Sequence, residues 1–584
     1  ERETGKTYLA LVTGAWASNK KVIDLPLHKY LQADGERRVR VTTADDTTAG
    51  NWLVVAPPGS GRIATAGLAT NGSPEDLGRS PGPTIPAPVF GAPDRRRGLL
   101  VGIVIALIAA VTRLWDLTHP TDKGTPVFDE KHYAPQGWQV LHGGNWIEDN
   151  PAYGLVVHPP VGKWMLAAGQ AVFGYGPMGW RIMPALCGIA IVVMIYCAAR
   201  RISRSTLVGA MAGLLAICDG VLFVQSRIGM LDIFQAFFVV AAFTALLADR
   251  DQMRRRLDTA YHAGLIGASP YGPRFGFRWY RFTAGVMLGL ACGTKWSGIY
   301  FVVAFTLLSL AFDVAARRAY RVQRPWLGVL RRDVVPSSLS LAVMPALIYL
   351  ATFAPWFASE TAVYRYQVSA GDPGPPGWLP AAWRSLWYYQ SGILKFHEGL
   401  TSSAGNHHPW ESKPWTWPMG LRPMLYAVET GPDRCGGSGC MRVQMLIGTP
   451  AIWWLALPVL AWSLWAFLGR RDWRYGAVLV GYAAAFAPWF ANIDRQMYFF
   501  YATVMAPFLV ILVALCLGDI LRHAAGLPKR RDGSPSDRQI LLVGLVAVYL
   551  ALVVVNFAWL WPVLAGVPIT KLHWHQEIWL PSWS

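Results

Sequence analysis

Charged residues are scarce in this sequence of 584 residues. They make up 15% of it, whereas soluble globular proteins carry about 25%. Hydrophobic residues account for 53%, and the mean hydropathy is +0.29. The apolar residues come in long blocks rather than in a stripe of helical period. These features exclude a large soluble core and predict a chain that is mostly embedded in lipid.

Cysteine and acidic residues are also few. Seven cysteines are too few for a disulfide scaffold, although Cys435 and Cys440 flank a Gly-rich loop where a short, local disulfide is permitted. The 35 Asp and Glu residues are outnumbered by 53 Lys and Arg, for a formal charge of +18. Because the basic residues fall in short loops between apolar blocks, the excess indicates membrane topology rather than nucleic-acid binding.

Eleven apolar blocks predict membrane spans, the fifth being short for a full crossing. They are residues 98–115, 180–199, 205–224, 230–248, 281–293, 296–314, 336–357, 448–468, 475–491, 497–518 and 539–561. With the N-terminus in the cytoplasm, every strongly basic short loop falls inside. The outer side then holds loops 116–179 and 358–447 and the tail 562–584. We therefore expect an all-α, multi-pass protein of the cell membrane.

The first 97 residues differ from the rest. Residues 1–46 resemble a fragment of an RluC-type RNA pseudouridine synthase at 6–12, 23–27 and 35–41. The Arg-Leu-Asp motif that carries that family's catalytic aspartate is not present, so we expect a remnant without activity. Residues 47–97 are rich in Gly, Pro, Ala and Thr and end in three arginines, which is typical of a flexible linker with a basic stop before the membrane.

The first outer loop contains two adjacent carboxylates, Asp129 and Glu130, within Phe-Asp-Glu-Lys-His-Tyr. Partial burial among aromatic residues would raise a carboxylate pKa towards the range of a general base. The equally weighted alternative is an ordinary helix start, where acidic residues are favoured. Further along, His158 opens a His-Pro-Pro-Val-Gly-Lys run that ends at Lys163 and leads into a predicted interfacial helix, 162–173. A simple turn with a snorkelling lysine is the alternative there.

Three cations, Arg227, Lys295 and Arg495, occur at the outer ends of predicted spans. Ionisable groups at membrane depth are costly and mark either a site or a structural pair. The structural alternatives are Arg227 with Asp232 and Asp494 with Arg495. Taken together, the acids and cations face one compartment, where acids can activate a hydroxyl and cations can hold a phosphate. That combination outlines a transferase that uses a lipid-linked sugar.

Four ordered motifs resemble those of protein O-mannosyltransferases, glycosyltransferase family 39, most closely its actinobacterial branch. They lie at 128–133, 158–163, 226–232 and 293–298, and the resemblance covers 98–584. It implies a GT-C fold with the active site on the outer face. It also implies transfer of mannose from polyprenyl-phosphate-mannose to Ser and Thr hydroxyls of exported proteins, which would be threaded unfolded through the Sec translocon.

Carried over by position, the resemblance implies that Asp129 is the catalytic base and that Glu130 positions the acceptor or assists the base. Arg227 and Lys295 would contact the donor phosphate or shape its pocket. The same resemblance places two further residues in the loop near the donor, His158 and Lys163. Arg495 is our addition from the topology.

The implied mechanism is a single inverting displacement. Its leaving phosphate is already ionised, so it needs cations rather than a general acid. A divalent metal cofactor is not argued, because two carboxylates are too few ligands for a hard cation.

Loop 358–447 is aromatic and contains His397 and His407-His408. For it we favour contact with the acceptor peptide or with lipid over a metal site.

Two other classes of function stay open. One is a GT-C transferase that acts on a lipid or glycan acceptor, such as an aminoarabinose or arabinosyl transferase. The other is a transporter, which would predict inverted repeats and charges at the midplane of the membrane. The sequence shows no repeat, and its charges lie at the ends of the spans.

Overall fold

The computed structural model describes residues 27–31, 37–41, 94–150, 152, 156–368, 377–405, 407–431, 435 and 439–584. The chain divides into two units, 1–84 and 85–584. In the first unit, β1 (Leu27–Leu31) pairs antiparallel with β2 (Arg37–Val41). Residues 6–12 and 23–26, which carry part of the resemblance to a pseudouridine synthase, and the linker up to 93 lie outside the described residues.

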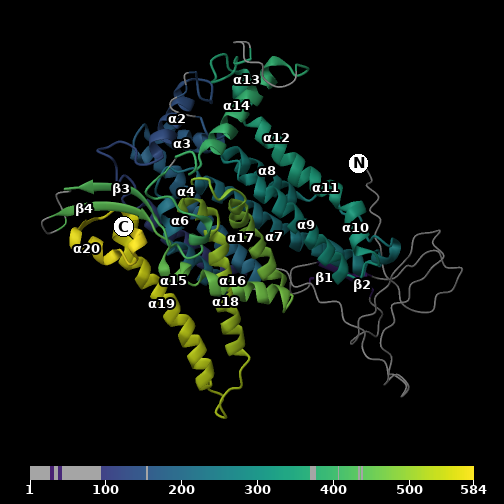
Figure 1. The fold of residues 1–584 in the computed structure, drawn as a ribbon. Helices are drawn as coiled ribbons and strands as arrows, with labels where there is room; N and C mark the ends of the chain where they lie inside the picture. The colour runs from purple at the N-terminus through teal and green to yellow at the C-terminus, as the bar shows by residue number, and fades with distance from the viewer. Residues whose placement is uncertain are drawn as a thin grey trace. The chain divides into compact units, whose positions relative to one another are not determined.

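The second unit is a helical membrane domain (Figure 1). Among the described residues, eight helical stretches are long and apolar enough to cross a bilayer. They are α1 (Arg95–Leu114), α4 (Pro177–Ser203), α7 (Asp232–His262), α9 (Gly298–Ala319), Val334–Ala358, Pro450–Leu468, α18 (Ala506–Ala525) and α19 (Asp537–Ala565). Val334–Ala358 comprises α11 to α13, and Pro450–Leu468 comprises α15 and α16. The all-α, polytopic fold class is confirmed.

The remaining three predicted spans correspond to shorter helices, so the count of eleven stays a prediction. They are α5 (Thr206–Ile217), α8 (Trp279–Thr294) and α17 (Trp473–Phe486). The apolar block 205–224 is interrupted because Asp219 caps a new helix, α6 (Gly220–Gln225). Its carboxylate accepts hydrogen bonds from the Leu222 amide at 2.8 Å and the Trp453 indole at 2.7 Å.

Helix α7 lies at the centre of the domain and packs against α4, α8 and α9. It starts at Asp232, beside the elements described next. Near the middle of α7, Asp249 pairs with buried Arg278, which also pairs, at 2.7 Å, with Asp313 of α9. Buried charges are tolerated there because each has an opposite charge in contact.

Several elements outside the spans gather at one end of the domain (Figure 1). They are α2 (Glu130–His142), α3 (Val161–Phe173) and α14 (Ala381–Gly399). Helix α3 confirms the helix predicted at 162–173. The connection between α18 and α19 lies at the opposite end.

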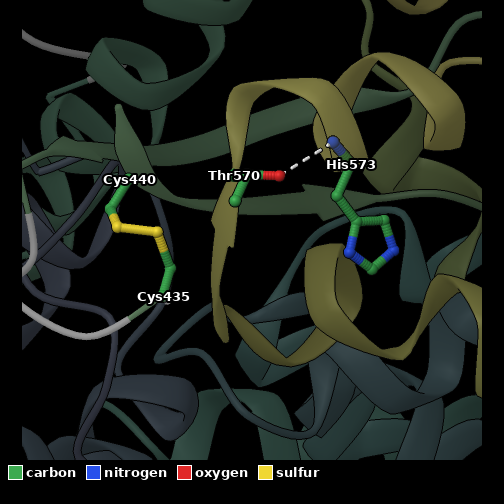
Figure 2. Close-up of a disulfide and its surroundings, with 4 residues drawn as sticks. All are labelled: Cys435, Cys440, Thr570 and His573. Carbon is green, nitrogen blue, oxygen red and sulfur yellow. Dashed lines mark hydrogen bonds between the residues drawn. A yellow bond between two sulfur atoms is a disulfide. The ribbon is translucent and has the colours of Figure 1, made fainter. Parts of the chain in front are cut away.

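A three-stranded sheet brings the C-terminal tail to the loop before α15. Its order is β3 (Met424–Thr430), β4 (Cys440–Leu446) and β5 (Pro568–Thr570), all antiparallel. Figure 2 shows the predicted disulfide between Cys435 and Cys440. Cys440 pairs in register with Thr570, whose hydroxyl accepts a hydrogen bond from the His573 amide at 3.2 Å and so caps α20 (Lys571–Glu577). The disulfide therefore joins the connection between β3 and β4 to the first residue of β4, which lies beside the tail.

Candidate active site

The start of α2 holds Asp129 at the edge of an aromatic cluster. The preceding residue, Phe128, has a φ of 47°, and its ring lies 5.2 Å from that of Tyr426 and 6.1 Å from that of Phe500. The half-buried Asp129 carboxylate accepts no side-chain hydrogen bond in the described part of the chain. Burial raises its pKa to about 6, although the positive charge of Lys295 opposes this rise. The result is an available carboxylate of increased basicity.

The adjacent Glu130 has a different environment. It is fully buried, and its two oxygens accept hydrogen bonds from the Arg181 guanidinium, both at 2.8 Å. The amides of Val127 and Gly229 donate two more, at 3.1 and 2.7 Å. A carboxylate with four donors has no oxygen left for an acceptor. Glu130 thus joins the start of α2 to α4 and to the loop before α7. Its predicted role, to position the acceptor or to assist the base, stays a prediction, and Glu130 would fill it through these neighbours.

A cavity of about 270 Å³ lies between the start of α7, the turn after α8 and the segment before α18. Two of the predicted cations, Lys295 and Arg495, line it. Lys295 pairs with Asp232 at 2.9 Å and lies 5.4 Å from the ring centre of Tyr501. Because Lys295 and Asp232 both affect the pKa of Asp129, the carboxylate and the cation-lined cavity belong to one electrostatic neighbourhood.

Two histidines form one wall of this cavity. The His158 ring lies 5.4 Å from the His397 ring. His397 accepts a hydrogen bond at Nδ1 from Arg495 at 3.0 Å and donates from Nε2 to the Val157 carbonyl at 3.1 Å. Burial lowers the pKa of His397 to about 4, and burial followed by the Lys295 charge lowers that of His158 well below its usual value. Both rings are therefore neutral at pH 7, and Arg495 and Lys295 supply the positive charge.

Two other predicted residues lie outside the cavity lining. Arg227 is fully buried and donates to the carbonyls of Arg113 at 3.1 Å and Asp116 at 3.1 Å, at the C-terminal end of α1. This guanidinium caps a helix whose carbonyls carry partial negative charge. The predicted role of Arg227, to contact the donor phosphate or to shape its pocket, stays a prediction. Lys163 is buried in an ion pair with Glu148, which ties α3 to the loop that precedes it.

Both structural pairs considered from the sequence are wrong. Asp232 pairs with Lys295 rather than with Arg227. Asp494 accepts a hydrogen bond from the Ser403 hydroxyl at 2.5 Å, whereas Arg495 contacts His397. The sequence suggested pairs between near neighbours, whereas the true partners, Lys295 for Asp232 and His397 for Arg495, come from other segments of the chain.

Sequence reasoning missed several residues that line the cavity. They are Asp232, Gln235, Trp489 and Tyr501. Asp232 lies in the same motif as Arg227, so the motif itself carried the signal. Trp489 and Tyr501 lie at the ends of apolar blocks, where aromatic residues are common in any membrane protein, so no local pattern distinguishes them as part of a cavity wall. Within the described ranges, no three His, Cys, Asp or Glu side chains gather as a metal site.

A basic carboxylate beside a cation-lined cavity, at one end of a bundle of apolar helices, defines a polytopic membrane transferase. The family model "Dolichyl-phosphate-mannose-protein mannosyltransferase" matches residues 103–270, and "C-terminal four TMM region of protein-O-mannosyltransferase" matches 382–583. The chain belongs to this protein O-mannosyltransferase family and is a glycosyltransferase, as the four motifs predicted.

Named relatives match over nearly their whole length. A polyprenol-phosphate-mannose–protein mannosyltransferase of Mycobacterium tuberculosis is 58% identical over 506 residues, 86% of this chain and 95% of that protein. The Corynebacterium glutamicum protein of the same name is 45% identical over 492 residues, 82% of this chain and 92% of that protein.

A solved structure shows the same fold. It is the S. cerevisiae protein O-mannosyltransferase Pmt1-Pmt2 complex bound to the sugar donor, with a TM-score of 0.64 at 15% identity. The match covers 84% of this chain and 93% of that one. This likeness confirms the predicted GT-C architecture.

Proposed function

We propose that this enzyme transfers mannose from polyprenyl-phosphate-mannose to Ser and Thr hydroxyls of exported proteins. The observation that carries the proposal is the available, half-buried carboxylate of Asp129 beside the cavity lined by Lys295 and Arg495. The names of the mycobacterial and corynebacterial relatives support the mannosyl donor and the protein acceptor.

In the proposed reaction, the acceptor hydroxyl loses its proton to Asp129 as its oxygen bonds to the anomeric carbon of mannose. The bond from that carbon to the phosphate oxygen breaks, and the polyprenyl phosphate leaves with the electron pair. Attack opposite the leaving group converts a β-linked donor to an α-mannoside. Lys295 and Arg495 stabilise the negative charge that grows on the phosphate, so no general acid is needed.

The remaining predicted residues act as positioning residues in this proposal. Glu130, held by Arg181, fixes the first turn of α2 and with it the direction of Asp129. His158 orders the cavity wall through its contact with His397. Two buried cations outside the cavity hold the segments around it. Lys163 ties α3 to the preceding loop through Glu148, and Arg227 holds the C-terminal end of α1.

We place the active site on the outer face of the cell membrane, with the N-terminus in the cytoplasm. Support comes from the basic residues at the start of α1 and at the end of α4, the side of the domain opposite to α2. An outer site suits an acceptor that emerges unfolded from the Sec translocon. The aromatic loop 358–447 would contact that acceptor or the lipid.

The test is transfer by membranes supplied with radiolabelled polyprenyl-phosphate-mannose and a Thr-rich peptide. Asp129→Asn should abolish labelling of the peptide while the protein still inserts normally. The matched control is Asp122→Asn in the same loop, whose exposed side chain pairs with Lys131 at 3.1 Å. The control should label the peptide at the wild-type rate, and full activity of Asp129→Asn would remove Asp129 from its role.

The acceptor class is tested in the same assay. Label that appears in a lipid or glycan fraction, and not in the peptide, would support the alternative transferase. Uptake of the donor across sealed vesicles without any transfer would support a transporter.

A further inference from the structure

A groove of about 590 Å³ lies between loop 411–422 and the C-terminal tail at 580–582. The tail is fixed to the loop, because Arg422 donates to the Ser582 carbonyl and the Ser582 hydroxyl donates to the Leu421 carbonyl. Both segments belong to the predicted outer side of the membrane. We therefore expect the groove to open towards the same compartment as the active site.

The groove lies next to the active site. Lys413, which lines the groove, donates to the backbone carbonyl of Arg495 at 3.1 Å, and the Arg495 side chain lines the active-site cavity. At the start of the loop, the Glu411 amide donates to the His408 carbonyl at 3.0 Å. The His408 ring lies 6.4 Å from the ring of Phe128, the residue before the proposed base. The groove is therefore continuous with the surroundings of the reacting groups.

One side of the groove is apolar. The Trp415 side chain is 57% exposed, and Pro581 across the groove is also exposed. The half-buried side chains of Leu421 and Leu580 lie in the same lining. An indole ring offers a large apolar contact surface, so this wall suits an apolar side chain that leaves water.

The polar part of the lining contains a single group without a partner. The other polar side chains have hydrogen bonds within the protein: Ser412, Lys413, Thr416, Arg422 and Ser582. The half-buried Glu411 carboxylate accepts no hydrogen bond from the residues that the structure describes. A carboxylate that loses water without gaining a donor is destabilised. A ligand that brings an N–H group to Glu411 would remove that cost.

We infer that this groove binds the exported polypeptide beside its reacting Ser or Thr, with an apolar side chain against Trp415 and a backbone N–H at Glu411. The inference rests on the proposed function, which makes a polypeptide the acceptor. An extended chain carries side chains on alternate sides and N–H groups along its edge, so it can meet both walls at once. An acyl chain has no N–H group to offer Glu411, and the groove therefore favours a peptide over a lipid.

The first experiment uses wild-type membranes, the labelled donor and a peptide with one Thr among glycines. A single leucine is placed in turn at about four positions on either side of the Thr, which is about 13 Å of extended chain. At one preferred position kcat/KM should rise about tenfold over the glycine peptide, because an apolar side chain is buried there. Trp415→Ala should bring this ratio to about one. The matched control, Trp146→Ala, removes an indole that is 53% exposed in the other outer loop and should keep the ratio.

The second experiment locates the peptide in the groove. Photo-leucine at the preferred position should cross-link to residues 411–422 or 580–582. Methylation of one backbone nitrogen of the peptide should lower kcat/KM about tenfold in wild type, because a hydrogen bond to a carboxylate is lost. The same methylation should have no effect in Glu411→Ala.

The leucine scan and the cross-linking need no variant, so they decide the question even if a variant does not fold. Equal kcat/KM for every leucine peptide and the glycine peptide would overturn the inference alone. Cross-linking only to other segments, or loss of the preference in Trp146→Ala as well, would also overturn it. If wild type labels no peptide at all, the proposed function fails and the inference fails with it.

Discussion

The Lys295 ammonium group lies 2.9 and 3.0 Å from the two carboxylate oxygens of Asp232. Lys295 is 7% exposed and Asp232 is 2% exposed, and both line the cavity. The pair joins the turn after α8 to the first residue of α7. Because one carboxylate holds the ammonium group in place, the cation stays at one position in the cavity wall before any donor enters.

Removal of the Lys295 charge should affect stability and transfer separately. Lys295→Met leaves Asp232 buried without its partner, which should cost about 3–5 kcal/mol of unfolding free energy. It should also lower transfer by about 10²–10³-fold, because a group that stabilises the leaving phosphate is lost. Combined with Asp232→Asn, the variant should regain thermal stability but not transfer. Recovery of transfer in the double variant would show that Lys295 serves only the fold.

The pH dependence of transfer should follow Asp129. Its pKa is raised to about 6 by burial, and a base must be ionised to accept a proton, so kcat/KM should fall about tenfold per pH unit below 6. The residual kcat/KM of Asp129→Asn should not fall in this way below pH 6. A wild-type profile that stays flat down to pH 4.5 would contradict the assignment.

The same shift sets the sign of the contribution that Asp129 makes to stability. The folded protein keeps the proton up to about pH 6, whereas the unfolded chain loses it near the ordinary value of 3.8. The contribution is therefore full below pH 3.8 and is lost as the pH rises to 6. Thermal unfolding of Asp129→Asn, compared with wild type across this window, should show the difference.

Glu130 should prove to be a positioning residue. Glu130→Gln removes the charge that faces buried Arg181, so we expect a loss of about 3 kcal/mol in unfolding free energy. Transfer per folded molecule should fall far less than in Asp129→Asn. A Glu130→Gln protein with wild-type stability and no transfer would instead make Glu130 a catalytic group.

Arg227 should matter for the fold and not for donor affinity. Arg227→Met leaves the carbonyls at the end of α1 without their charged donor, which should cost about 2–3 kcal/mol. The KM for the polyprenyl-phosphate donor should stay at the wild-type value in the folded protein. An increased KM for the donor with unchanged thermal unfolding would instead show that Arg227 binds the donor phosphate.

The helix boundaries show how much of the secondary structure the local sequence pattern predicts. Block 98–115 was predicted within a few residues of α1, because a long apolar run has one stable form in lipid. Block 205–224 was predicted as one span and contains a break. Asp219 caps α6 through the Leu222 amide, and its second carboxylate oxygen accepts a hydrogen bond from Trp453, which lies 234 residues further along the chain. This second, long-range contact could not be recognised from the local sequence.

The sequence by itself determined the class of protein and the set of residues near its chemistry. Apolar blocks must form helices in lipid because backbone groups there have no water to bind, and four ordered motifs identify the family. Only the tertiary structure decided that Lys295 and Arg495 share a cavity, while Arg227 caps α1 and Lys163 pairs with Glu148. A buried charge pairs with the opposite charge that packing brings within about 4 Å of it. The residues next to it in sequence do not predict which partner that will be.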